Sequence, residues 1–227
     1  MPEKKIPELL SPAGSMDSLW AAINNGADAV YLGASSFGAR SSAGFDAQAL
    51  QQAVQTAHLY GKRVYVTLNT LIKEKEFLAF TQSLLQVIEA GADAVLVQDT
   101  GALLYIKKHF PHIPVHASTQ MTIHTLHGAQ AAKHLGIDRV VFARETSLST
   151  LEKATEAGIE VEVFVHGALC VSVSGQCTLS AMNGGRSGNR GRCAQPCRMM
   201  YTYRNQAGAW LSPRDIRMAE NIQGLKD

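Results

Sequence analysis

Four cysteines are the residues of this sequence with the most distinctive chemistry, and they lie in one stretch. The chain contains Cys170, Cys177, Cys193 and Cys197 and no other cysteine. They fall in residues 166–197, HGALCVSVSGQCTLSAMNGGRSGNRGRCAQPC, which we call the cysteine loop. Four thiolates can hold a tetrahedral zinc ion or an iron–sulfur cluster, and two thiols can instead form a redox-active or disulfide pair.

The spacing of the cysteines favours a cluster and leaves the other two chemistries open. Six residues separate the first pair, fifteen separate the two pairs, and three separate the second pair. Structural zinc sites usually use closer pairs, such as Cys-x2-Cys. Glycines in the loop allow backbone N–H groups to approach sulfur, and Arg186, Arg190 and Arg192 place positive charge beside an anionic cluster or a phosphate backbone.

A second set of polar residues follows the predicted strands where each strand ends. Arg144 and Arg40 suit an anionic substrate group, Glu145 a general acid or base, and His166 a proton shuttle near neutral pH. Each also has a purely structural interpretation: Glu145 can pair with either arginine, and His166 can simply be hydrogen-bonded at a strand end. The predicted substrate-binding residues are Arg40, Asn69, Gln98, Ser118, Gln120 and Arg144.

The elements that must position these residues alternate along the chain. Strands are predicted at residues 8–10, 28–32, 62–68, 93–97, 115–117, 139–143 and 160–165, with material for an eighth at 201–203 and 210–211. Helices are predicted at 16–24, 47–60, 76–90, 101–109, 125–135, 148–157 and 213–225, the first capped by Ser15, the fourth by Thr100 and the sixth by a capping box at Ser149 and Glu152.

Repeated strand–helix units predict an α/β fold with a parallel sheet. The helix-to-strand junction NGADAVYLG at 25–33 returns as AGADAVLVQ at 90–98. Seven or eight such units indicate a (β/α)8 TIM-like barrel, formed as a single domain over residues 1–227, with the cysteine loop after strand seven. Its active site would lie at the carboxyl ends of the strands. An open doubly wound sheet is the alternative, although no GxGxxG follows the first strand.

Composition indicates an ordinary globular protein. The chain has 227 residues, 46% of them hydrophobic and 18% charged, with a net charge of +2. No apolar run approaches the roughly 18 residues that span a bilayer, and the N-terminus lacks the apolar core of a signal peptide. We therefore expect a cytoplasmic protein with no membrane partner. Thiols stay reduced in that compartment, which favours metal-binding or catalytic cysteines.

Several catalytic motifs are absent. The sequence has no HExxH, no GxSxG and no Walker A loop, so zincin, α/β-hydrolase and P-loop chemistries are excluded. A nucleophilic pair of Cys170 with His166 is conceivable, but a lone nucleophile does not need three further cysteines.

Long ordered segments resemble the peptidase U32 family, also called collagenase-like peptidases. They include ELLSPAG, GADAVYLG, FGARSSAG, HASTQMTIH, EVFVHGALCVSVSGQC and GGRSGNRGRCAQPC. The likeness runs from about residue 8 to 203. It implies a (β/α)8 barrel that forms the N-terminal part of a longer architecture, because relatives continue past the position where this sequence stops.

The resemblance implies different activities in different branches of the family. One branch hydroxylates the wobble uridine of transfer RNA without O2, with prephenate as the implied oxygen source. Another modifies a ribosomal RNA cytidine, and a third acts in ubiquinone synthesis with 4Fe–4S clusters bound through cysteines of this motif. For this chain, the resemblance implies a 4Fe–4S cluster on Cys170, Cys177, Cys193 and Cys197.

We therefore expect an enzyme that hydroxylates an RNA base, foremost the wobble uridine of tRNA, with a small carboxylate such as prephenate as co-substrate. The family name supplies the alternative of a collagenase-like peptidase. A zinc-stapled, non-catalytic subunit is a further alternative.

Overall fold

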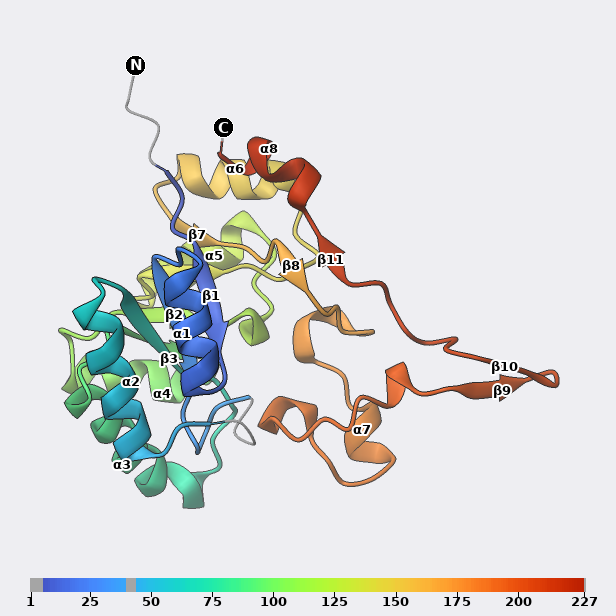
Figure 1. The fold of residues 1–227 in the computed structure, drawn as a ribbon, viewed down its shortest axis with the longest axis horizontal. Helices are drawn as coiled ribbons and strands as arrows, with labels where there is room; N and C mark the ends of the chain where they lie inside the picture. Colours follow the sequence, from blue (N-terminus) through green and yellow to red (C-terminus); the bar gives the residue numbers. More distant parts are fainter. Residues whose placement is uncertain (1–5, 40–43, 227) are drawn as a thin grey trace.

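The protein is built from strand–helix units that follow one another along the chain, as Figure 1 shows for the computed structural model. The structure describes residues 6–39 and 44–226. The strands of the main sheet are β1 (Leu10–Ala13), β2 (Ala29–Gly33), β3 (Arg63–Leu68), β4 (Ala94–Val97), β5 (Val115–Ala117), β6 (Arg139–Val141) and β7 (Glu160–Glu162). The helices between them are α1 (Met16–Asn24), α2 (Ala47–Leu59), α3 (Phe77–Glu89), α4 (Thr100–His109), α5 (Leu126–His134) and α6 (Leu148–Glu156).

The remaining elements belong to the cysteine loop and the segment after it. They are β8 (His166–Gly167), α7 (Leu179–Met182), β9 (Tyr201–Tyr203), β10 (Gln206–Gly208), β11 (Ile216–Arg217) and α8 (Ile222–Lys226). Among the described residues, no helix combines the length and the apolar character needed to cross a membrane.

Strands β1 to β7 form one parallel sheet in which each strand pairs with the next in sequence. Val30 lies opposite Val64, for example, and Val140 lies opposite Val161. This order results when every crossover turns in the same direction. A doubly wound sheet would reverse its strand order and place helices on both faces, so the doubly wound alternative is wrong.

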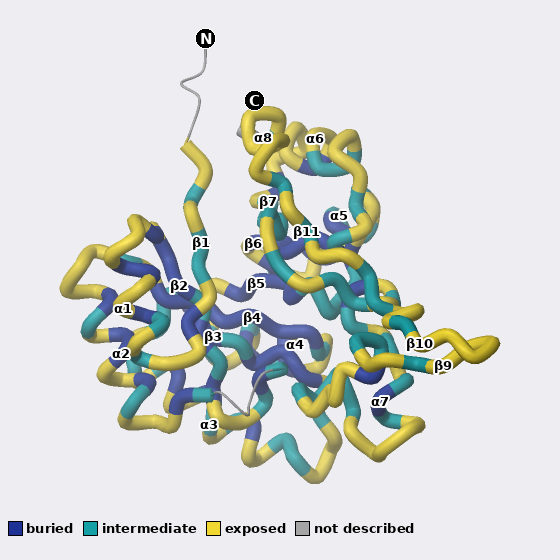
Figure 2. Tube along the Cα trace, turned by 45° about the vertical axis from the view of Figure 1, so that its right-hand side comes forward, coloured by how far each residue is buried: buried dark blue, intermediate teal, exposed yellow. Residues whose placement is uncertain are grey.

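The helices α1 to α6 pack on a single face of this sheet. Their buried residues, such as Leu19 and Leu103, form one apolar cluster with alternate strand residues such as Val64. The intervening strand residues, among them Tyr65 and Leu96, form a smaller cluster on the other face. Figure 2 shows that the central strands, from β2 to β6, are mostly buried. Parallel sheets normally have both faces buried. The face of this sheet that no helix covers is buried because the sheet curls, so that its own side chains pack against one another.

The predicted eighth strand does not join the sheet. Residues 201–203 form β9, which pairs antiparallel with β10 in a separate hairpin, and residues 210–211 are not in a strand. The reason is local: Arg204 and Asn205 have φ of 50° and 61°, the geometry of a two-residue hairpin turn that returns the chain at once. Within the described ranges, β1 and β7 are the edges of a curled, seven-stranded half-barrel.

Side-chain caps determine where the helices begin. Ser15 caps α1 by accepting a hydrogen bond from the backbone N–H of Ser18, as predicted. The predictions for two other helices were wrong by one or two residues: Asp99 caps α4 and Ser147 caps α6. In both cases the cap is the last residue whose backbone is still extended. Asp99 is thereby held at the carboxyl end of β4.

A buried charge cluster joins the strands at the amino-terminal end of the half-barrel. Arg139, at the start of β6, is only 7% exposed and forms ion pairs with Glu8, Glu160 and Glu162. Glu8 also accepts a hydrogen bond from the Tyr65 hydroxyl at 2.9 Å. Burial raises the pKa of Glu162 to about 7, against the lowering effect of Arg139. These contacts connect the segment before β1 to β3, β6 and β7, which requires a curled sheet.

Candidate functional site

Buried polar side chains hold the carboxyl ends of β3 and β5 together. Asn69 donates from Nδ2 to Ser118 Oγ at 3.0 Å, and its Oδ1 accepts the backbone N–H of Ala39 at 2.9 Å. Ser118 Oγ also accepts the backbone N–H of Gln120 at 3.3 Å. Because Asn69 and Ser118 are 8% and 1% exposed, their polar atoms serve this network in the structure as it stands.

Gln98 and Gln120 face the cysteine loop. Gln98 accepts a hydrogen bond from Asn189 Nδ2 at 2.9 Å, and the backbone carbonyl of Gln120 accepts one from Gln176 Nε2 at 2.8 Å. Gln120 Oε1 is buried and has no hydrogen-bond partner among the described residues. A buried acceptor without a donor is unfavourable, so this oxygen is available to a donor group of a ligand or a water molecule.

Glu145 holds the turn between the first two cysteines. Its Oε1 accepts the backbone N–H of Ser174 at 3.1 Å, and its Oε2 accepts the Ser174 hydroxyl at 2.7 Å. Ser174 is fully buried, with φ of 25°, a value that few residues other than glycine adopt. Burial raises the pKa of Glu145, but the hydrogen bonds from Ser174 outweigh it and leave the pKa below its ordinary value. The carboxylate is therefore ionised at neutral pH.

A second contact joins the cysteine loop to the segment before α3. Asn189, which also contacts Gln98, accepts the backbone N–H of Leu71 at 3.2 Å. Arg190 donates to the carbonyl of Leu71 and forms an ion pair with Glu76, both at 2.8 Å. Glu76 thus provides Arg190 with a carboxylate partner inside the protein, and the position of Arg190 beside a cluster or a phosphate stays a prediction.

The four cysteines lie in two neighbouring parts of the loop. A Cβ atom placed on Gly188 would be 3.6 Å from Cβ of Cys193 and 3.6 Å from the carbonyl oxygen of Cys177. Arg198 donates to the carbonyl of Leu169 at 3.0 Å. Arg198 directly follows Cys197 and Leu169 directly precedes Cys170, so this hydrogen bond brings the two ends of the cysteine loop together.

Backbone N–H groups point at two of the sulfur atoms. Leu179 donates to Cys177 Sγ at 3.4 Å, and Gln195 donates to Cys193 Sγ at 3.3 Å. All four cysteines are free. N–H donors stabilise thiolate sulfur and tune the reduction potential of an iron–sulfur cluster. The four free thiols and these N–H groups are therefore the types of ligand and hydrogen-bond donor that such a cluster needs. As they stand, no three Cys, His, Asp or Glu side chains of the described residues are close enough together to hold a metal ion.

The two predicted anion-binding arginines have different outcomes. The guanidinium of Arg144 lies over the ring of Phe164, 4.2 Å from its centroid, and the backbone N–H of Arg144 donates to Ser174 Oγ at 3.1 Å. Its side chain is therefore at the carboxyl end of β6, beside the cysteine loop. Arg40 lies outside the described residues.

His166 does not sit at the end of β7. That strand ends at Glu162 rather than at residue 165, and His166 is exposed in β8, opposite Arg217 of β11. The chain leaves the sheet early because its next partner is this antiparallel strand. Within the described part of the chain, no hydrogen bond joins His166 to Cys170, as a Cys–His nucleophile pair would require.

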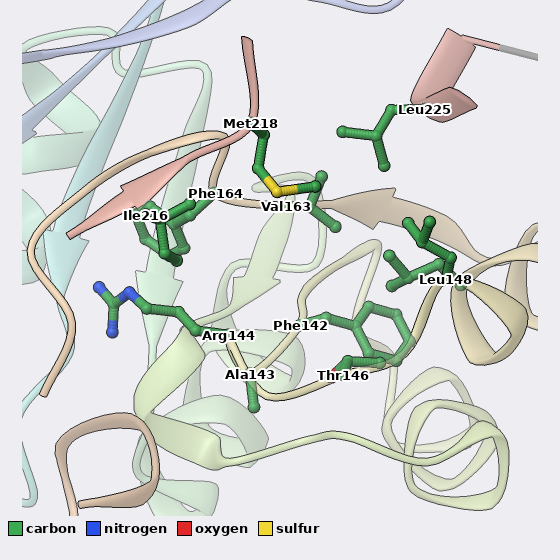
Figure 3. A pocket seen from close by; sticks show the side chains of 11 residues that line it. Phe142, Ala143, Arg144, Thr146, Leu148, Val163, Phe164, Ile216, Met218 and Leu225 are labelled. Carbon is green, nitrogen blue, oxygen red and sulfur yellow. The ribbon is translucent and has the colours of Figure 1, made fainter. Parts of the chain in front are cut away.

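An apolar pocket of about 180 Å³ lies between β6, α6 and the C-terminal segment that crosses them. Figure 3 shows its apolar side chains, with Arg144 at one edge and its guanidinium directed away from Phe142 and Leu148. The pocket is smaller than the roughly 300 Å³ at which ligand pockets begin. It is a packing space beside the cysteine loop. Its lining residues are Phe142, Ala143, Arg144, Thr146, Leu148, Leu151, Val163, Phe164, Ile216, Met218 and Leu225.

Sequence reasoning missed the residues that seat the cysteine loop: Ser174, Gln176 and Asn189. Each is a polar residue directly beside a glycine, in VSGQC and SGNRG. This arrangement was the available signal, because glycine lets a loop approach another backbone closely. At Gly191 the loop backbone passes so close to Ala39 that a Cβ atom on residue 191 would lie 2.6 Å from the carbonyl oxygen of Ala39.

The chain belongs to peptidase family U32, whose family model matches residues 14–227. The 23S rRNA 5-hydroxycytidine C2501 synthase of Escherichia coli is 41% identical over 223 residues, covering 97% of this chain and 33% of that protein. A tRNA hydroxylation protein P of Helicobacter pylori is 40% identical over 200 residues, covering 86% of this chain and 47% of that protein.

The solved structure of a U32 peptidase matches with a TM-score of 0.65 at 14% identity, covering 93% of this chain and 92% of that chain. At this identity the match shows a shared fold. The chain spans a third to a half of the length of the two curated relatives.

Proposed function

We propose that this chain takes part in hydroxylating an RNA base, foremost the wobble uridine of tRNA, in the cytoplasm. The main support is that a loop with four free cysteines contacts the carboxyl-terminal edge of the half-barrel. In addition, the chain is 40–41% identical to proteins named for tRNA and rRNA hydroxylation. In barrels of this type the reaction occurs at that edge. The proposal includes a closed barrel, with an eighth strand completing the observed sheet.

The proposed cofactor is a 4Fe–4S cluster held by Cys170, Cys177, Cys193 and Cys197. When bound, such a cluster supplies one-electron transfer at a potential set by hydrogen bonds to its sulfurs. The chain's own contribution is to seat the loop through Glu145 and to direct N–H groups at sulfur. Hydroxylation replaces a C–H bond of the base with C–O–H, which is a two-electron oxidation. Without O2, the co-substrate gives up the oxygen atom as one of its C–O bonds breaks, and it takes up the hydrogen and the two electrons in exchange.

We propose prephenate, a small carboxylate, as that co-substrate. Arg144 lies beside the cysteine loop and can pair with a carboxylate, as can Arg40. Gln120 offers an unpartnered oxygen to a donor group of the substrate. We assign proton transfer to Glu145 and His166. Because Glu145 is ionised at neutral pH, it acts as an acceptor first.

The test begins with anaerobic purification, followed by iron, sulfide and zinc analysis and a visible spectrum. We expect about four irons per chain and visible absorption that air bleaches. Wild type and a Cys193→Ser variant are then incubated with unmodified tRNA, a reductant and prephenate, and nucleosides are analysed by mass spectrometry. Wild type should yield a uridine with one added oxygen atom, and Cys193→Ser should not.

Two results would contradict the proposal separately. One zinc ion and no iron after anaerobic reconstitution would exclude the cluster and favour the zinc-stapled subunit. A loaded cluster with unmodified RNA would exclude RNA hydroxylation. Cleavage of gelatin by iron-free protein, lost in Cys170→Ser, would establish the peptidase alternative instead.

A further inference from the structure

The hairpin of β9 and β10 extends away from the half-barrel, as Figure 1 shows. Its two-residue turn, Arg204 and Asn205, has positive φ at both positions and so matches the twist of the flanking strands. Its base is fixed to the cysteine loop, because the Tyr201 hydroxyl donates to the carbonyl of Pro196 at 2.8 Å. The hairpin is therefore a defined projection attached directly to the proposed site.

Two aromatic side chains, Trp210 and Tyr203, are exposed on this projection, and a hydrogen bond holds the ring of Trp210 in place. Trp210 is 55% exposed, and its Nε1 donates to the carbonyl of Tyr201 at 3.0 Å. Its ring lies against Gly208 so closely that a Cβ atom there would be 2.8 Å from it. Tyr203 is 61% exposed, with the guanidinium of Arg204 5.2 Å from its ring centroid. Large apolar rings held open to solvent in this way indicate a contact surface.

The charge of this part of the chain is opposite to that of the rest. Residues 182–217 contain seven arginines and a single acidic residue, Asp215, so this segment carries +6 while the remaining residues carry −4 within the total of +2. Three of the arginines have carboxylate partners, because Arg190 pairs with Glu76, Arg198 with Asp215 and Arg217 with Glu220. The exposed arginines are Arg186, Arg192, Arg204, Arg214 and Arg217.

We propose that the β9–β10 hairpin and Trp210 form a contact surface for single-stranded RNA, with bases stacking on Trp210 and Tyr203 and phosphates meeting Arg204 in the turn of the hairpin. Exposed aromatic rings among arginines are the arrangement that binds unpaired nucleotides, because every base has a face to stack while a duplex hides it. The inference rests on the proposed function and identifies where the RNA flanking the target base lies.

The chain's two tryptophans make the proposal directly measurable. Trp20 lies on α1 and packs edge-to-face on Tyr60, with ring centroids 5.3 Å apart. A Trp20→Phe variant leaves Trp210 as its single tryptophan, and a Trp210→Phe variant leaves Trp20. Titration with a single-stranded RNA of roughly 12 nucleotides should quench fluorescence in Trp20→Phe and leave it unchanged in Trp210→Phe.

Affinity is measured in parallel by fluorescence anisotropy of the labelled RNA. Tyr203→Ala should weaken binding at least about fivefold through the lost stacking contact. Arg204→Asn keeps a residue that tolerates positive φ, and it should reduce the slope of log affinity against log salt by about 0.7. Lys153→Ala, which removes one exposed charge from α6, is the matched control and should leave both the affinity and the slope within error of wild type.

The outcomes separate this inference from the proposed function. Binding without quenching, or with no effect of Tyr203→Ala, would overturn the hairpin as the contact while leaving RNA as the substrate. No binding to any RNA by wild type would overturn both. Self-association that shields Trp210 from acrylamide would show that the surface is an interface between protein chains, which also overturns the inference.

Discussion

At the scale of single residues, Glu145 and Ser174 are the pair on which the cysteine loop depends. Both oxygens of the carboxylate accept hydrogen bonds from Ser174, and Ser174 Oγ in turn accepts the N–H of Arg144. The Ser174 hydroxyl is fully buried, donates one hydrogen bond and accepts another. Replacing it with an apolar side chain would leave Glu145 and the N–H of Arg144 without these hydrogen bonds.

We predict that Ser174→Ala lowers the free energy of unfolding by about 1–3 kcal/mol, because two buried hydrogen bonds are lost. Urea denaturation measures the change. Ser172→Ala is the matched control, since Ser172 lies in the same loop and its side chain has no hydrogen bond in the described residues; it should stay within about 0.5 kcal/mol of wild type. Equal effects of the two substitutions would contradict the assigned role of Ser174.

The pH dependence of that difference follows from the pKa of Glu145. The folded-state pKa lies below the ordinary value of 4.5, so the contribution of the ionised carboxylate is present above pH 4.5 and is lost as pH falls through the lower folded value. The gap between wild type and Ser174→Ala should therefore narrow below pH 4.5. A gap that widens on acidification would show that ionised Glu145 does not stabilise the turn.

At the scale of elements, the cysteine loop is held on the half-barrel by side chains rather than by strand pairing. Asn189 bridges Gln98, after β4, and Leu71, before α3. Such a segment can open locally while the sheet remains folded, because few backbone hydrogen bonds connect it to the strands.

We predict that Asn189→Ala increases the open population of the cysteine loop about fivefold to tenfold, as expected for the loss of roughly 1–1.5 kcal/mol of hydrogen bonding. Limited trypsin digestion reports this, because Arg186 and Arg192 flank the position and are exposed. Asn183→Ala, on the same loop, exposed and without a side-chain hydrogen bond among the described residues, should leave the cleavage rate unchanged. Cleavage of Asn189→Ala at the wild-type rate would show that Asn189 does not anchor the loop.

At the scale of the whole molecule, the charge cluster at the amino-terminal end connects strands that the sequence separates widely. Arg139 reaches Glu8, which precedes β1, and Glu162, which ends β7. Glu162 binds a proton more tightly in the folded state, with a pKa of about 7, than at its ordinary 4.5, so its contribution lowers stability as pH rises from 4.5 to 7. His116 has the opposite effect on the pH dependence of stability. Burial lowers its pKa from 6.5 to about 3 in the folded state, so the free energy of unfolding rises as pH increases from 3 to 6.5.

We predict that Glu162→Gln removes the first of these effects. The stability of the variant relative to wild type should increase between pH 4.5 and 7, by up to roughly 3 kcal/mol, and then level off. Chemical denaturation at a series of pH values measures it. The control is Glu156→Gln on the exposed side of α6, for which no such trend is expected. A pH-independent difference for Glu162→Gln would mean that the carboxyl group is ionised throughout.

The sequence by itself determined six of the seven strands, the six helices between them, the four thiols and the family. These follow from local signals: the period of apolar residues, the residues at helix termini, and ordered motifs. The first strand was predicted at residues 8–10 and lies instead at Leu10–Ala13. The two wrong caps, Thr100 and Ser149, show the resolution of such signals, since each lies within two residues of the true cap, Asp99 or Ser147.

Only the tertiary structure decided what each site residue contacts. Glu145 meets Ser174 across 29 positions of the chain, and Asn189 meets Leu71 across 118. It also decided that β9 turns back on β10, while β11 pairs with β8 instead of closing the barrel. The physical reason is that a buried donor or acceptor takes whichever partner packing brings within reach, and packing depends on segments far apart in the sequence.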